Sequence, residues 1–190
     1  MTARLVTAPT VPAVDLADVK RNLRIDADDT SLDASLADWI VGVIAHAEHY
    51  TGRALMSQGW RVALDAFPAV IALPKAPVLS IDTVKYYDVD GTLQTLASTE
   101  YTVDTETAPG RIVPAPTKSW PSTQTGRINA VLVDLTAGYG TTSASTPAGF
   151  KLYLLAKIAE QFDPNARGER VTVQSTYIDM MLDPFKIWSV

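Results

Sequence analysis

Apolar positions recur every three or four residues over 32–47, which predicts one long amphipathic helix. The stripe consists of Leu32, Leu36, Trp39, Ile40, Val43, Ile44 and Ala47. Thr30 or Ser31 would begin this helix, with Asp33 placed for a capping box on Thr30. Gly52 would take the left-handed position that ends it.

Two further helices are predicted. The first begins after Asp15, which would cap it, and turns three apolar side chains inward: Leu16, Val19 and Leu23. The other begins at Thr146-Pro147, in the usual order of cap and proline, and ends at Asp163-Pro164. Residues 1–13 are rich in small residues and proline, and we predict an extended arm there.

Between these helical segments the apolar period changes to two, which predicts strands. Trp60, Val62 and Leu64 alternate with smaller or more polar residues, and Asp90-Gly91 is a strong hairpin turn signal. Strands are predicted over 60–65, 71–74, 80–88, 92–96, 101–104, 111–113 and 129–136. The proline-rich residues 114–127 are predicted to form a surface loop.

The order of helices, strands and helices predicts an α+β protein. A small helical bundle would carry a β-rich insertion between the long second helix and the C-terminal helices. A chain of 190 residues is long enough for such a fold. We predict an N-terminal arm over 1–13 and a single domain over 14–190. The domain would comprise helices over 14–54, the β-rich insertion over 57–137, and C-terminal helices and tail over 146–190.

The end of the chain is unusually apolar. Six of its side chains are candidates for docking on a partner: Tyr177, Met181, Leu182, Phe185, Ile187 and Trp188. Burying even three such side chains is worth about 5 kcal/mol or more. The segment could instead fold back on its own bundle, and both alternatives remain open. The polar residues 164–176 are predicted to be mobile in the free subunit and ordered in an assembly.

Composition narrows the function classes. The net charge of −5 argues against tight wrapping of nucleic acid, which needs a basic face, but it suits the wall of a channel through which DNA slides. The absence of cysteine excludes disulfides and thiolate metal sites, and fits an intracellular or virion protein. The longest apolar run, over 39–45, is too short to span a bilayer. The N-terminus lacks the apolar block of a signal peptide, so neither export nor membrane association is expected.

Few residues could carry chemistry. His46 and His49 have a helical spacing that could supply half of a metal site, but the chain has no other histidine and no cysteine to complete it. The aspartates over 26–29 and 88–90 lack the twelve-residue calcium loop with its terminal glutamate. We interpret them as helix-start and turn residues, and the histidines as solvated.

Gly138-Tyr139-Gly140 follows a strand but lacks the Gly-Lys-Ser/Thr ending of a phosphate-binding loop. It opens a small, polar stretch, 138–145, that we interpret as a flexible linker. No Gly-x-Ser-x-Gly elbow occurs. We therefore predict no catalytic, cofactor-binding or metal-binding residue, and no enzyme. A metal-assisted hydrolase using His46 and His49 is the weakest alternative.

The aromatic residues allow a function of another class. Trp60, Trp120, Tyr86 and Tyr87 could form the platform of a small β-rich module that binds sugar or peptide. Aromatic residues in a β-rich segment are more often core or subunit contacts.

One motif stands out between the long helix and the strands: Tyr50-Thr51-Gly52-Arg53-Ala54-Leu55, followed by Gln58 and Trp60. Weaker motifs lie before and after it: Lys20, Leu23-Arg24, Asp28-Asp29, Leu73-Pro74, Pro77-Val78, Tyr86, Asp88, Asp90-Gly91, Tyr101, Trp120-Pro121 and Thr136-Ala137-Gly138-Tyr139-Gly140. In this order they resemble the head–tail connector (adaptor, or head-completion) family of tailed bacteriophages. The resemblance extends from about Leu16 to Trp188. The region after Phe162 departs from it, being longer and more polar.

This resemblance implies a structural protein of a phage, a prophage or a gene transfer agent. Members of the family form a dodecameric ring beneath the portal, extend the DNA channel and dock the next head-completion (stopper) or tail protein. The chain would then be a homo-oligomer at the head–tail junction of the virion, and in the host cytoplasm during assembly. DNA would pass through the lumen without sequence-specific binding. No catalytic residue or cofactor defines the family, so none is implied.

Overall fold

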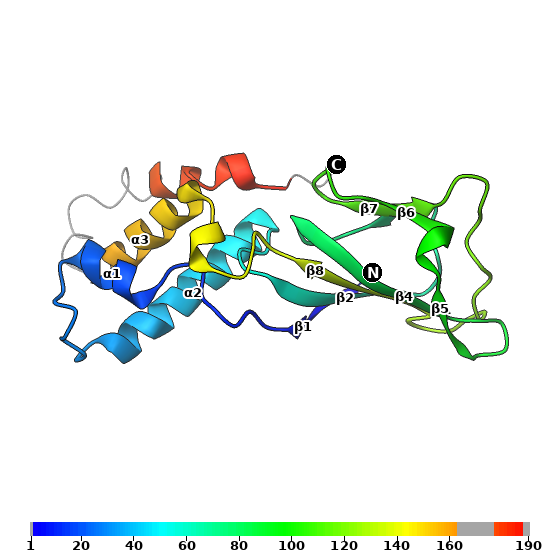
Figure 1. Ribbon diagram of the computed structural model, residues 1–190, viewed down its shortest axis with the longest axis horizontal. Helices are drawn as coiled ribbons and strands as arrows, with labels where there is room; N and C mark the ends of the chain where they lie inside the picture. The colour runs from blue at the N-terminus through cyan, green and yellow to red at the C-terminus, as the bar shows by residue number, and fades with distance from the viewer. Residues whose placement is uncertain (1, 163–176, 188–190) are drawn as a thin grey trace. The chain divides into compact units, whose positions relative to one another are not determined.

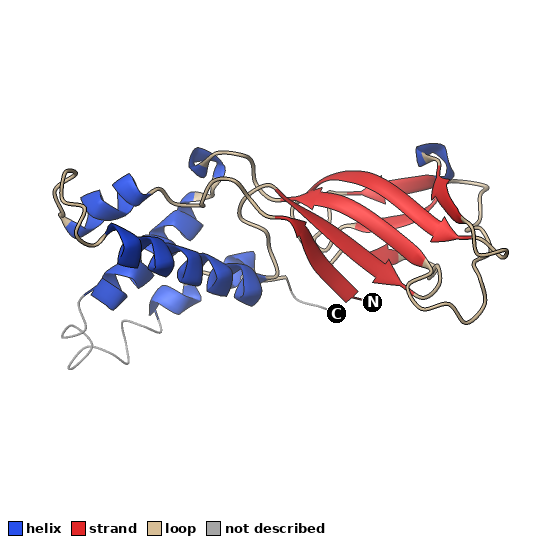
Figure 2. Cartoon of the chain, turned by 90° about the horizontal axis from the view of Figure 1, so that it is seen from below, coloured by secondary structure: helices blue, strands red, loops and turns tan. Residues whose placement is uncertain are grey.

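The computed structural model describes residues 2–162 and 177–187 (Figure 1). The predicted segment 164–176 and Trp188 lie outside the described residues. The described chain divides into two compact units: a β unit within residues 1–8 and 57–138, and a helical unit within residues 9–56 and 139–188. Figure 2 shows the strands in red and the helices in blue. The α+β class is confirmed, and the predicted domain over 14–190 is divided between the two units.

The helical unit is built from α1 (Leu16–Leu23), α2 (Asp33–Thr51) and α3 (Ala148–Phe162), which contact one another. Residues 177–180 are also helical, and Asp183–Phe185 form a short 3-10 turn. The core consists of buried apolar side chains from the three helices, the segments beside them and the C-terminal segment: Ala13, Val14, Val19, Leu36, Ile40, Val43, Ala47, Leu55, Met56, Phe150, Tyr153, Leu154, Ile158, Ile178 and Leu182.

The long helix α2 ends as predicted and begins differently. Gly52 has φ 72° and closes the helix, with its N–H donating to the Glu48 carbonyl at 3.1 Å. The predicted capping box on Thr30 is wrong: α2 begins at Asp33, and its start has no side-chain cap. The Asp33 carboxylate lies instead 2.6 Å from the buried Lys20 ammonium. A buried charge must be compensated by a partner of opposite charge. The Asp33 carboxylate therefore compensates the Lys20 ammonium and does not cap the helix.

The segment before α3 is also more ordered than the sequence suggested. Residues Ser143–Ser145, expected within a flexible linker, form a 3-10 turn. The Ser143 hydroxyl donates to the Asp15 carboxylate, and Asp15 makes no side-chain cap to α1. Asp15, which we predicted to cap α1, therefore connects the residue before α1 to the 3-10 turn before α3.

The β unit contains two antiparallel sheets. The larger has the order β1 (Thr2–Thr7), β2 (Gln58–Leu64), β8 (Val131–Ala137), β4 (Val78–Tyr87) and β5 (Leu93–Leu96). The smaller has the order β3 (Ile71–Ala72), β7 (Arg111–Pro114) and β6 (Tyr101–Asp104). A 3-10 turn, η1 (Ser98–Glu100), precedes β6. The buried apolar side chains come from both sheets and the loops beside them: Val62, Leu64, Ile71, Leu73, Val78, Val84, Ile112, Val131, Val133 and Leu135.

Two local predictions in the β unit have different outcomes. The Asp90-Gly91 turn is confirmed, because Gly91 has φ 80° and the Asp88 carboxylate accepts the Asp90 and Thr92 N–H groups. The predicted arm over 1–13 is corrected over Thr2–Thr7, which forms the edge strand β1 against β2. All six of its residues are exposed, so the sequence carried no inward-facing pattern to reveal it.

Candidate functional site

The motif Tyr50–Leu55 forms the end of α2 and the turn that follows. The Thr51 hydroxyl donates to the Ala47 carbonyl at 2.7 Å. The Glu48 carboxylate accepts the Leu55 N–H at 2.7 Å, which folds the chain back over the last helical turn. These contacts hold the backbone on both sides of Gly52, within the motif that carries Tyr50 and Arg53.

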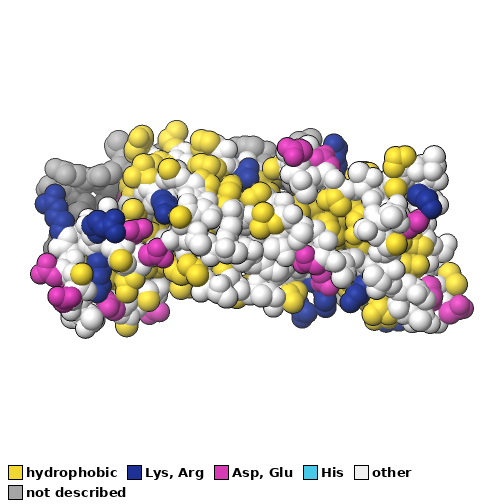
Figure 3. Space-filling model, in the orientation of Figure 1, with side chains coloured by type: hydrophobic (Ala, Val, Ile, Leu, Met, Phe, Trp, Pro, Cys, Tyr) yellow, Lys and Arg dark blue, Asp and Glu magenta, His cyan; other side chains and the backbone are white. Residues whose placement is uncertain are grey.

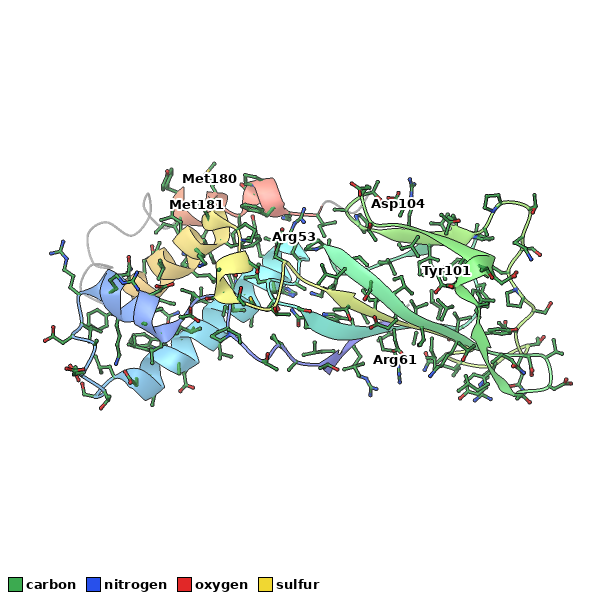
Figure 4. All side chains as sticks on the ribbon, viewed as in Figure 1. Arg53, Arg61, Tyr101, Asp104, Met180 and Met181 are labelled. Atoms are coloured by element: carbon green, nitrogen blue, oxygen red, sulfur yellow. The ribbon has the colours of Figure 1, made fainter. Side chains whose placement is uncertain are left out.

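The same motif binds the C-terminal segment, residues 177–187. The Tyr50 hydroxyl donates to the Asp183 carboxylate at 2.8 Å. The Arg53 Nε donates to the Phe185 carbonyl at 2.5 Å, and the Ile187 N–H donates to the Thr51 carbonyl at 3.0 Å. Figure 4 labels Arg53 near this segment, which also carries Met180 and Met181. The motif is therefore a receptor for the end of its own chain.

Tyr139, from the weaker motif Thr136-Ala137-Gly138-Tyr139-Gly140, contacts the main motif Tyr50–Leu55. Its hydroxyl accepts a hydrogen bond from Arg53 Nη1 at 3.2 Å, and its N–H donates to the Leu55 carbonyl at 3.3 Å. Its ring packs on Phe150, which in turn packs on Phe185 with centroids 4.4 Å apart. The two motifs thus meet around the C-terminal segment.

The six predicted docking residues do not all reach the surface. Leu182 is 1% exposed and belongs to the core, Phe185 packs on Phe150, and the Ile187 side chain lies close to Gly52. For these three the structure favours the alternative that the segment folds back on its own bundle. Tyr177 is 68% exposed, Met181 is partly exposed, and Trp188 lies outside the described residues.

Ionic contacts hold the segment as well. The Lys157 ammonium on α3 lies 2.8 Å from the Asp179 carboxylate and 3.1 Å from Glu160. Burial lowers the pKa of Lys157, but the hydrogen bonds to Asp179 and Glu160 outweigh this and the pKa is raised. The hydrogen bond to the Asp183 carboxylate raises the pKa of Tyr50. No sequence pattern pointed to Asp179 and Asp183, because their partners Lys157 and Tyr50 are not their neighbours along the chain.

The β unit carries a polar row across neighbouring strands. Arg61 on β2 faces Asp134 on β8, with Nε and Nη2 at 2.6 and 3.0 Å from its two carboxylate oxygens. The Thr83 hydroxyl on β4 donates to the same carboxylate at 3.1 Å. The Arg61 hydrogen bonds, chiefly, hold the pKa of Asp134 below its usual value.

The other candidate residues do not converge. His46 and His49 are exposed on α2, and the His46 ring stacks on Tyr50. Within residues 2–162 and 177–187, no three His, Cys, Asp or Glu side chains form a group that could hold a metal ion. Across the same ranges, no helix has the length and apolar character needed to cross a bilayer.

The aromatic residues of the β unit contact other side chains of the same unit. Trp120 stacks on Phe67 with centroids 4.7 Å apart, and Tyr86 contacts the same Phe67. Arg127 covers the Tyr87 ring, and the Lys75 ammonium lies over Trp60. Trp60, Trp120, Tyr86 and Tyr87 therefore do not present a shared open platform for a sugar.

Comparison with solved structures identifies the fold. A chain from the virion of a native gene transfer agent (GTA) particle aligns with a TM-score of 0.81 and 24% identity. A chain from the neck of an empty GTA particle, computed with C6 symmetry, aligns at 0.83 and 25%. One from the neck of a native GTA particle, computed with C12 symmetry, aligns at 0.79 and 24%. Each alignment covers 100% of this chain and 97% of the other.

No protein-family model and no curated protein sequence matches the chain. The chain has the fold of neck chains from a phage-like particle. This agrees with the head–tail resemblance found in the sequence and with its expected place in the virion, at the head–tail junction.

Proposed function

We propose that this chain is a structural connector of the head–tail neck of a phage-like particle, of the gene transfer agent kind. The observation that carries the proposal is the likeness to GTA neck chains, with TM-scores of 0.79 to 0.83 over the full length of this chain. Similarity of a complete fold at this level supports a shared structural role more strongly than any single motif does.

The connector acts as a ring. One of the similar neck structures was computed with C12 symmetry and another with C6 symmetry, which supports a dodecamer of this chain. The ring lies beneath the portal, extends the DNA channel and receives the next head-completion or tail protein. A net charge of −5 suits a lumen through which DNA slides, because an acidic wall does not retain phosphate.

Docking on the portal or on the next component uses the exposed part of the C-terminal segment. Tyr177 and Met180 are 68% and 59% exposed, and Met181 is partly exposed. Leu182, Phe185 and Ile187 hold the segment on its own bundle. Apolar side chains reach the surface at several places (yellow in Figure 3). Contiguous exposed apolar side chains mark protein contacts, and Tyr177 and Met180 are three residues apart on one helical turn.

The binding of a sugar or peptide through the aromatic residues is not favoured. The Trp120 and Tyr86 rings pack on Phe67, and cationic side chains cover Trp60 and Tyr87. A platform would need these ring faces free and aligned.

Deletion of the gene from the phage or host that encodes the chain tests the connector function. We expect DNA-filled heads that carry no tails, because the portal would lack its ring. Expression of the intact chain from a plasmid should restore tailed particles. Tailed, DNA-transferring particles from the deletion strain would contradict the proposal.

A further inference from the structure

We propose that neighbouring copies in the ring are joined by strand pairing, in which the free edge of β1 in one copy accepts β5 of the next copy. This inference rests on the proposed ring and specifies the contact that closes it. The sheet would thereby continue from one subunit to the next.

The five-stranded sheet has two open edges. β1 and β5 stand at its ends, and among residues 2–162 and 177–187 each pairs on one side only, β1 with β2 and β5 with β4. An edge strand presents a row of unpaired N–H and C=O groups, which is a template for another strand. A ring needs two different, complementary surfaces on each copy. The two edges of one sheet meet this requirement.

Both edge strands leave apolar side chains in water. All six residues of β1 are exposed, with Leu5 at 41% and Val6 at 50%. On β5, Leu93 is 45% exposed. β1 contains neither lysine nor proline, residues that commonly protect such an edge from another chain. A strand that buries none of its side chains gains little to offset its ordering entropy, so a second strand beside it would stabilise it.

The charges at the two edges are complementary. Arg4 on β1 stands opposite Arg61 on β2, and Arg61 is already engaged by Asp134. Like charges directly opposite destabilise a strand pair. In the described part of the chain, Arg4 has no ion pair, and neither has Asp90, in the turn that precedes β5. A free cation at one edge and a free anion beside the other favour the contact between copies.

Disulfide cross-linking tests the pairing, because the chain has no cysteine of its own. Cysteine is introduced in pairs, Thr2→Cys or Ala3→Cys together with Gln94→Cys or Thr95→Cys, so that both faces of each strand are sampled. All four positions are exposed. Within one copy, β1 and β5 are separated by three strands, or roughly 19 Å across the sheet. A disulfide spans far less, so any bond must join two copies.

We expect that at least one pair, oxidised in rings assembled with the portal, gives a ladder of covalent multimers, while each single-cysteine variant gives none. Rings that form normally but yield no ladder from any pair would overturn the strand pairing and leave the connector function intact. Absence of rings, measured separately by native mass spectrometry with the portal present, would count against the proposed function itself.

A second pair tests whether β1 stays on its own copy. Thr2 and Ala63 are partners across β1 and β2, so Thr2→Cys with Ala63→Cys should give a bond within one chain. If this pair instead links different chains, β1 is exchanged between copies and our assignment is wrong. If β1 cysteines link to portal cysteines and not to β5, the partner of the edge is the portal, which would also overturn it.

Discussion

The residues of the motif Tyr50–Leu55 hold the C-terminal segment on the helical unit. Tyr50, Thr51 and Arg53 each bind a different residue of the C-terminal segment, and Gly52 ends α2 with φ 72°, a backbone conformation that favours glycine. The sequence could single out this motif by resemblance. It could not show what the motif binds, because Asp183, Phe185 and Ile187 lie more than a hundred residues further along.

Replacing Arg53 by Lys should destabilise the helical unit. Lysine can replace one hydrogen bond but not the fork that reaches both the Phe185 carbonyl and the Tyr139 hydroxyl. We expect the free energy of unfolding to fall by about 1–3 kcal/mol, measured by urea denaturation. Arg21→Lys is the control, since Arg21 makes an exposed pair with Asp18 and should change stability by less than about 0.5 kcal/mol. Equal effects of the two variants would refute a role for the Arg53 fork.

Asp134 should make the β unit sensitive to acid. Its pKa is lowered in the folded chain, chiefly by Arg61, so its contribution is present above the ordinary value of 3.8 and is lost as the pH falls through the lowered pKa. Asp134→Asn should reduce stability at pH 7 by roughly 0.5–1 kcal/mol and flatten the acid limb below about pH 4. Thermal melts from pH 2 to 7 measure this, with Asp18→Asn as the control. An unchanged acid limb would contradict it.

Secondary-structure elements were predictable where their side chains have an inside and an outside. α2 and β8 show this, because apolar residues recur at the helical period in one and alternate in the other. β1 was missed since none of its residues is buried. The start of α2 was misplaced because Asp33 pairs with Lys20, a contact that helix-start rules do not contain. The C-terminal segment was known to need burial, but the choice between its own core and a partner depended on tertiary packing.

Buried and exposed side chains of the C-terminal segment should differ in their effect on stability. Leu182→Ala removes a core side chain and should lower the free energy of unfolding by about 2–5 kcal/mol. Met180→Ala, on the exposed side of the same segment, should change it by less than about 0.5 kcal/mol. Thermal or urea unfolding of both variants makes the comparison. A small loss for Leu182→Ala would contradict the packing seen here.

Tyr177→Ser with Met180→Ser should leave the melting temperature nearly unchanged, because both side chains are exposed. The double variant should nevertheless fail to restore tailed particles to the deletion strain, since the docking surface is removed. Ala37→Ser with Val41→Ser on the exposed side of α2 is the matched control. If the Tyr177 and Met180 double variant restored tailed particles to the deletion strain in full, the docking proposal would be wrong.

The whole molecule consists of two compact units, each with its own exposed features. The helical unit holds its own C-terminal segment, on which Tyr177 and Met180 are exposed. The β unit has an open sheet edge at β1 and another at β5. Composition is compatible with this fold but does not predict it, because a net charge of −5 and the absence of cysteine occur in many folds. The head–tail assignment came from ordered motifs, and the likeness to GTA neck chains then supported it at the level of the complete fold.

Electron microscopy of this chain assembled with its portal would show whether the chain forms a connector ring. We expect a single ring of twelve copies bound to the tail-facing end of the portal, with an open central channel. Native mass spectrometry of the same sample should give the mass of twelve 20.5 kDa chains in excess of the portal. A symmetric dimer as the only oligomer, present both alone and beside the portal, would contradict the account.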